Sequence, residues 1–180
     1  MTNNLTAVLL FTGAGGMDIG FENAGVQVVF ANELMPEAVA TYNANHAEGI
    51  MVNDDINNVM DRLDQFQGVD LVFGGPPCQR GSVAAKMDPD DDRNKLIFTF
   101  LDVVERVKPR AFVMENVKAL GKLEKCESVR KKYLVRVQKL EEFAWRIIRF
   151  SLKRWYDGRY VRLIGILCSK TGGRSGWHYI

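Results

Sequence analysis

Short apolar runs alternate with helix-like stretches through the first 117 of the 180 residues, and this alternation constrains the fold more than any other feature. The runs predict strands at residues 7–11, 26–31, 50–52, 71–73 and 111–114, with helices at 17–24, 36–45 and 94–107 between them. Such alternation indicates an α/β domain with a doubly wound, mainly parallel sheet. Ligands bind outside the carboxyl ends of the strands in such sheets, so we expect the site residues to follow the strands.

The last third of the chain has a different pattern. Residues 122–155 contain few helix breakers and carry apolar residues at helical spacing, which predicts one long, basic, amphipathic helix that is broken once at most. A turn at Asp157-Gly158, a last strand at 160–168 and a loose end at 171–180 follow. We therefore expect a core over residues 1–120 and a second, basic segment over residues 121–180.

Charge is distributed unevenly between these two parts. Residues 1–117 hold 8 Lys+Arg and 17 Asp+Glu, a net charge of −9, whereas residues 118–180 hold 16 Lys+Arg and 5 Asp+Glu, a net charge of +11. A basic segment of this kind indicates contact with a polyanion or an acidic surface, or else a helix whose basic face is solvated.

Composition excludes several classes of protein. The 47% hydrophobic and 26% charged residues are average for a soluble globular protein, and the apolar runs are shorter than a membrane span. No basic region precedes the first apolar run, so the chain does not begin like a secretory signal. Cys78, Cys126 and Cys168 do not form a disulfide or zinc pattern, and His46 and His178 lack ligand spacing. We expect a cytoplasmic or nucleoid-associated protein that binds no metal.

A glycine-rich turn follows the first predicted strand and leads into a helix. Its sequence is Phe11-Thr12-Gly13-Ala14-Gly15-Gly16. Glycines allow a ligand to approach the backbone closely, and a helix N-terminus favours negative charge. The pattern is typical of sites for nucleotides, phosphates or S-adenosylmethionine, and it also occurs in plain tight turns.

Carboxylates follow the second and third predicted strands. Glu33 ends the second strand, where a carboxylate can accept hydrogen bonds from ribose hydroxyls, although a lone Glu there is often only solvated. Asp54 or Asp55 ends the third strand and could accept a hydrogen bond from an adenine amino group. The alternative for this pair is a helix cap before Ile-Asn-Asn-Val.

The segment GGPPCQ, residues 74–79, follows the fourth predicted strand. Two prolines fix two φ angles, so the turn holds Cys78 rigidly at the strand end, which suits a thiolate nucleophile. Most cysteines are instead small buried hydrophobes. Glu115 ends the strand at 111–114, and if the two strands pair, the thiol and a carboxyl group share one site. A partly buried Glu there could hold a proton and act as a general acid.

The motifs FTGAGG, NE, DDI, GGPPCQ, DDRN and ENV, in this order and spacing over about residues 6–120, resemble those of the DNA cytosine C5-methyltransferases. PPCQ followed by ENV is the most specific part. The resemblance implies a Rossmann-like methyltransferase fold and transfer of a methyl group from S-adenosylmethionine to C5 of cytosine. It also implies double-stranded DNA as the partner, with the target cytosine flipped out of the duplex.

The resemblance also implies roles for individual residues. Cys78 would add to C6 of cytosine, and Glu115 would contact N3 and the exocyclic amine and protonate N3. The implied substrate contacts are Gln79, Ser82, Arg93 and Asn116. The implied cofactor contacts are Phe11, Gly13, Gly15, Gly16, Glu33, Asp55, Gly75 and Pro76.

The chain also departs from the family pattern. Gly81 stands where the family usually has Phe, and Ala85 stands where it usually has Gly. We find no Gln-x-Arg-x-Arg segment, no target-recognition region and no closing Asn-containing motif. Three explanations fit these departures: a split enzyme completed by a second polypeptide, a truncated or frameshifted remnant, or a divergent tail that replaces the missing parts. We therefore expect the chain to bind S-adenosylmethionine but to have little or no activity alone.

Other functions fit the sequence less fully. The chain could be a non-catalytic fragment that binds cofactor or DNA, or a relative that methylates RNA such as tRNA. A dinucleotide oxidoreductase would explain the glycine turn and Glu33 but leaves PPCQ and ENV unexplained.

Overall fold

The computed structural model describes residues 5–46, 49–77, 92–115, 131–133, 135–137, 139, 145–156 and 159–170. Among these residues, no helix is both long enough and apolar enough to cross a lipid bilayer.

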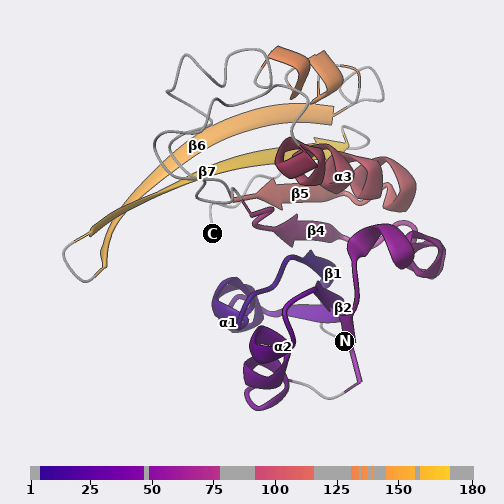
Figure 1. Ribbon diagram of the computed structural model, residues 1–180. Coiled ribbons are helices and arrows are strands. Elements are labelled where there is room, and N and C mark those ends of the chain that lie inside the picture. The colour runs from indigo at the N-terminus through magenta and orange to yellow at the C-terminus, as the bar shows by residue number, and fades with distance from the viewer. Residues whose placement is uncertain are drawn as a thin grey trace.

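Five parallel strands form the central sheet, in the order β3-β2-β1-β4-β5 (Figure 1). The strands are β1 (Leu5–Leu10), β2 (Val26–Glu33), β3 (Met51–Asn53), β4 (Leu71–Gly74) and β5 (Ala111–Met114). The helices are α1 (Gly16–Asn23), α2 (Pro36–Asn43) and α3 (Asp92–Val107), with the 3-10 turns η1 (Ile56–Asn58) and η2 (Met60–Phe66) before β4. The doubly wound parallel sheet that the alternation predicts is confirmed.

Each face of the sheet is covered by its own layer. Successive side chains of β1 point to opposite faces, so Val8 and Leu10 belong to one buried cluster and Ala7 and Leu9 to the other. Residues of α3, η1 and η2 complete the first cluster, whereas residues of α1 and α2 pack in the second. Because β1 is buried on both faces, its sequence LTAVLL is almost continuously apolar, as is usual in parallel sheets.

The pairing of β1 with β2 contains one register shift. Ala7 pairs with Val28, but the next residue, Val8, pairs with Phe30. The shift leaves Val29 without a partner on β1 and exchanges the faces of the residues that follow it. Accordingly, Val28 packs in the α1 and α2 layer, Phe30 packs in the α3 layer, and Ala31 returns to the α1 and α2 layer.

The prediction of one long helix over residues 122–155 is wrong for its second half. Residues 131–133, 135–137 and 139 are helical, but Trp145–Tyr156 forms strand β6, which pairs antiparallel with β7 (Arg159–Lys170). Apolar residues of β6 recur with period two at Ile148, Phe150 and Leu152, and aromatic and β-branched residues are common there. Ile148 and Leu152 also match helical spacing, so the sequence permits both assignments.

The hairpin agrees with two other sequence features. Tyr156 pairs with Arg159, so two residues, Asp157 and Gly158, separate the strands. An Asp-Gly pair between strands is a strong hairpin signal. The last strand predicted at 160–168 is confirmed within β7, which lies close to β5 (Figure 1).

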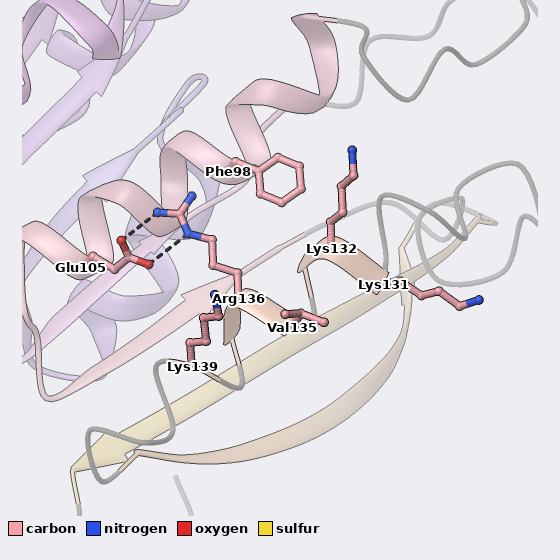
Figure 2. A pocket seen from close by; sticks show the side chains of 7 residues that line it. All are labelled: Phe98, Glu105, Lys131, Lys132, Val135, Arg136 and Lys139. Atoms are coloured by element: carbon pink, nitrogen blue, oxygen red, sulfur yellow. Dashed lines mark hydrogen bonds and ion pairs between the residues drawn. The ribbon is translucent and has the colours of Figure 1, made fainter.

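The helical residues before the hairpin pack against α3 through an apolar face. Tyr133 and Val137 are buried in the same cluster as the apolar residues of α3. Arg136 donates from Nε to Glu105 Oε1 at 3.0 Å and from Nη2 to Glu105 Oε2 at 2.8 Å, and it also bonds Asp102. These acidic side chains of α3 therefore neutralise part of the basic segment's charge. A shallow pocket beside this contact is lined by Phe98, Lys131, Lys132, Val135, Lys139 and the Arg136–Glu105 pair (Figure 2).

Asp70 links the amino ends of β1 and β4. Its Oδ2 accepts from the Thr6 N–H at 2.9 Å, and its Oδ1 accepts from Arg110 Nη1 at 2.7 Å. Burial alone would raise the pKa of Asp70, but the bonds from Thr6 and Arg110 hold it below its ordinary value. The carboxylate therefore stabilises the fold above the unfolded-state pKa of about 3.9, and this contribution is lost as pH falls through the lower folded-state pKa.

Asp70→Asn is expected to lower the free energy of unfolding by about 1–2 kcal/mol at pH 7, because it weakens bonds made to a charged acceptor. Urea denaturation of both proteins at pH 7 and near pH 3 measures the effect. The difference between them should shrink at the lower pH, and a difference independent of pH would contradict this assignment.

Candidate functional site

The strand order reverses between β1 and β4, which are neighbours at the centre of the sheet. Crossovers to opposite sides leave a crevice at the carboxyl ends of two such strands, and ligands bind there in doubly wound folds. The turn after β1 carries the glycine-rich motif, and the GGPP segment begins at Gly74, the last residue of β4, and continues into the turn that follows. The topology therefore brings the two most distinctive sequence motifs to one edge of the sheet.

The glycine turn is held by backbone hydrogen bonds. The Thr12 N–H donates to the Asn32 carbonyl at 3.2 Å, and the Gly15 N–H donates to the Thr12 carbonyl at 3.1 Å. Gly13 and Gly15 have φ of +54° and +87°, a region that favours glycine, and Phe11 also has a positive φ of +54°. A Cβ built on Gly13 or Gly16 meets no atom within 4 Å, so open space lies beside both residues. The turn thus presents accessible backbone in front of α1.

Glu33, at the end of β2, braces this turn. Its Oε2 accepts from the Gly13 N–H at 2.8 Å, and its Oε1 accepts from the N–H groups of Leu34 and Met35, both at 2.9 Å. A carboxylate offers about four acceptor positions, so three backbone bonds leave capacity for a ligand hydroxyl. The side chain lies where the sequence predicts a ribose-binding carboxylate.

The third strand end is organised by Asn32 and two aspartates. Asp55 is the N-cap of η1, and its Oδ1 accepts from the Asn57 N–H at 2.8 Å, which is the capping alternative considered for it. Asn58 and the Asp55 N–H bond to Asp54 and lower its pKa. The buried Asn32 donates to the carbonyls of Val52 and Asp54, at 3.1 and 2.9 Å, and so fixes this loop to β2.

Glu115 lies beside the turn after β4. The two strands pair as the sequence analysis requires, with Gly74 opposite Met114, and the Glu115 N–H donates to the Gly74 carbonyl at 2.9 Å. A Cβ built on Gly75 would come within 3.0 Å of Glu115 Oε2, so the carboxyl group packs against that glycine. Burial raises the pKa of Glu115. Pro76 is buried and Pro77 is exposed.

Several predicted site residues are not among those that the structure describes. Cys78, Gln79, Ser82 and Asn116 lie outside the described residues, as does the side chain of Arg93. The described part of the site therefore consists of the glycine turn, the carboxylates after β2 and β3, and Gly75, Pro76 and Glu115.

A buried polar cluster that the sequence did not predict lies behind the glycine turn. Tyr42 donates to Asp18 Oδ2, and the ring of His46 stacks on Tyr42 with centroids 4.3 Å apart. His46 Nδ1 lies 3.5 Å from Asp18 Oδ2 and 3.4 Å from Glu22 Oε2. The available signal was the i,i+4 spacing of Asp18 and Glu22, which places both on one face of α1, whereas His46 follows the end of α2.

Together these features define a class of protein. A parallel sheet with a glycine turn after β1, carboxylates after β2 and β3, and a Pro-Pro turn paired with a strand-end Glu is a Rossmann-like methyltransferase fold.

Comparisons with known proteins identify the family. The profile of the C-5 cytosine-specific DNA methylases matches residues 5–148, which extends beyond the region of sequence resemblance and into the first part of β6. The chain belongs to the C-5 cytosine-specific DNA methylase family.

Individual relatives agree with this assignment. The chain is 41% identical over 120 residues to the Type II methyltransferase M.AquIA of Picosynechococcus sp. (63% of this chain and 48% of the relative). It is 40% identical over 124 residues to M1.HphI of Haemophilus parahaemolyticus (65% and 33%). A DNA modification methyltransferase encoded within an Escherichia coli prophage superposes with a TM-score of 0.73 at 26% identity, covering 92% of this chain and 47% of that one. The matched region thus spans from a third to about half of these proteins.

Proposed function

We propose that this chain carries the catalytic residues of a methyltransferase that acts on C5 of cytosine in DNA, with S-adenosylmethionine as the methyl donor. The observation that carries the proposal is the pairing of β4 with β5, which sets Glu115 against Gly75 of the GGPPCQ turn. A partly buried carboxyl group with a raised pKa, beside a turn that bears a cysteine, suits an acid and nucleophile pair.

The residues at the sheet edge fit the methyl donor. Open space beside Gly13 and Gly16 leaves room for a ligand near the backbone, and Glu33 retains capacity to accept from ribose hydroxyls. Asp55 would face the adenine edge of the donor. The other residues that would contact the donor are Phe11, Gly15, Gly75 and Pro76. The bound donor supplies an electrophilic methyl group.

The chemistry assigned to the chain's own residues begins with cytosine. The Cys78 thiolate adds to C6 while the Glu115 carboxyl group gives its proton to N3, which makes C5 an enamine-like nucleophile. After C5 has been methylated, a solvent base takes the C5 proton, the C5–C6 double bond re-forms as the C6–sulfur bond breaks, and N3 returns its proton to the Glu115 carboxylate. The target base must leave the duplex to reach the thiolate, and Gln79, Ser82, Arg93 and Asn116 would lie on the DNA side.

Covalent capture on DNA that contains 5-fluorocytosine tests the proposal, because fluorine at C5 blocks the final elimination. We expect an adduct that forms with S-adenosylmethionine present, disappears in Cys78→Ala and persists in the control Cys126→Ala. Glu115→Gln should slow its formation by about 10²–10⁴-fold, the usual contribution of a general acid. A chain that binds the methyl donor in calorimetry but forms no adduct would instead be a non-catalytic fragment. An adduct with fluorinated RNA alone would assign an RNA substrate.

The proposal includes a second polypeptide that supplies the target-recognition region. It rests on the absence of a recognisable Gln-x-Arg-x-Arg segment from the sequence. We therefore expect little steady-state methylation by the chain alone, and efficient turnover that Cys78→Ala abolishes would contradict this part.

A further inference from the structure

His46 lies directly behind the glycine turn. Its side chain is fully buried, and a Cβ built on Gly15 would come within 2.1 Å of His46 Nε2 and 3.0 Å of Tyr42 Cδ2. The imidazole therefore occupies the space that any larger residue at position 15 would need. Tyr42 covers one face of the ring through a nearly parallel stack at an interplanar angle of 21°.

The other edge of the ring faces α1. Nδ1 lies 3.4–3.5 Å from one oxygen of Asp18 and one of Glu22, which are within ion-pair distance but beyond a direct hydrogen bond. Asp18 is fully buried, and burial raises its pKa. Tyr42 donates to the same Asp18 oxygen, so α1 and α2 are joined through one polar cluster. The cluster spans from the start of α1, at the glycine turn, to the residues after α2.

The cluster could in principle hold a metal ion, because His46, Asp18 and Glu22 offer ligand atoms within 4.8 Å of one another. A metal on Nδ1 would, however, leave the imidazole proton on Nε2. That N–H would be buried against Gly15 with no acceptor, which is costly. With the proton on Nδ1, the N–H instead points toward two carboxylates, so the arrangement favours a purely protein network.

We propose that His46 is a positioning residue for the methyl-donor site. Its ring, held by Tyr42 and the α1 carboxylates, limits how far Gly15 can move, and it thereby keeps the glycine turn in the conformation that binds the donor. The inference rests on the proposed function for its ligand, S-adenosylmethionine. Preorganisation of this kind raises affinity without any contact between His46 and the ligand.

Three substitutions of His46 in the full chain distinguish the contribution of the ring to binding from the contribution of its polar Nδ1 edge. His46→Ala removes both and should weaken S-adenosylmethionine binding in calorimetry on the order of tenfold. His46→Phe retains a ring against Gly15, whereas His46→Asn retains only a donor near Nδ1. We expect the Phe variant to bind more tightly than the Asn variant. Asn43→Ala, an exposed change at the end of α2, is the matched control and should bind like the wild type.

A second test asks whether His46→Ala suppresses the binding defect of Gly15→Ala, a result that a general loss of stability would not produce. Gly15→Ala should bind more weakly than His46→Ala, because its Cβ collides with the imidazole. Gly15→Ala/His46→Ala should recover part of the affinity, although the strain of Ala at a φ of +87° remains. A double variant no better than Gly15→Ala would overturn the proposal.

Amide hydrogen exchange tests the same role without a ligand. In His46→Ala the amides of Gly13, Gly15 and Gly16 should exchange faster than in the wild type, while those of β4 stay unchanged. Unchanged exchange in the turn would overturn the positioning role. Failure of the wild type to bind S-adenosylmethionine would refute the proposed function, and the exchange result would still decide the role of His46.

Discussion

Gly74→Ala is expected to lower the free energy of unfolding by about 3 kcal/mol or more. A Cβ at this position would lie 2.1 Å from the carbonyl oxygen of Leu10 on the neighbouring strand. The obstructing atom is backbone in the middle of the sheet, so it cannot move aside as a flexible side chain could. Either β1 and β4 separate at their carboxyl ends or the substitution prevents folding. The same separation would also pull the two motif-bearing turns apart.

Urea denaturation followed by circular dichroism measures this effect. Gly20→Ala is the matched control, because Gly20 lies inside α1 with no atom within 4 Å of a built Cβ. Alanine there should be neutral or should stabilise the protein by up to about 1 kcal/mol, owing to its higher helix propensity. Equal unfolding midpoints for the two variants would show that the close approach at Gly74 is tolerated.

Glu33→Gln is expected to weaken S-adenosylmethionine binding on the order of 100-fold. Glutamine keeps the size of the side chain but replaces one carboxylate oxygen with an NH₂ group. At least one of the backbone N–H groups of Gly13, Leu34 and Met35 would then face a donor. The proposed bond to a ribose hydroxyl would also lose its charged acceptor, and a bond to a charged group contributes about 1.5–3 kcal/mol.

Calorimetric titration and a denaturation curve separate the two consequences of Glu33→Gln. Loss of the backbone contacts alone should cost about 1 kcal/mol of stability with little change in affinity. Glu37→Gln, an exposed substitution in the first turn of α2, changes the net charge identically and should affect neither measurement. If Glu33→Gln and Glu37→Gln bind the methyl donor equally well, Glu33 does not hold the ribose.

The central sheet could be predicted because its signals are local. Each strand of the core is a short apolar run that ends at a polar or glycine-rich turn, and Pro36 begins α2 at a position where proline favours a helix start. The carboxyl-end rule then placed Glu33 and Glu115 at the correct edge without any three-dimensional information. For Glu115, the pairing of β4 with β5 meets the condition of its prediction and sets the carboxyl group against Gly75, whereas Cys78 lies outside the described residues.

The features that sequence could not supply depend on distant contacts. Residues 145–155 satisfy both helical and strand periodicity, and pairing with β7 decides between them. The cluster of Asp18, Tyr42 and His46 joins residues up to 28 positions apart, and nothing in their separate helices indicates that they meet. Asn32 is a similar case, because its bonds to the loop after β3 arise only from the pairing of β2 with β3.

The unpaired Val29 has a consequence for insertions and deletions in β2. Asn32 and Glu33 perform different tasks on opposite sides of the strand, the amide toward the β3 loop and the carboxylate toward the glycine turn. A deletion between Phe30 and Asn32 would exchange those sides and present an amide to the turn. A deletion of Val29 itself would instead leave Val28 opposite Ala7 and Phe30 opposite Val8 in a regular ladder, with no change of partners on β1. Insertions or deletions in β2 should therefore be tolerated at Val29 and selected against between Phe30 and Asn32.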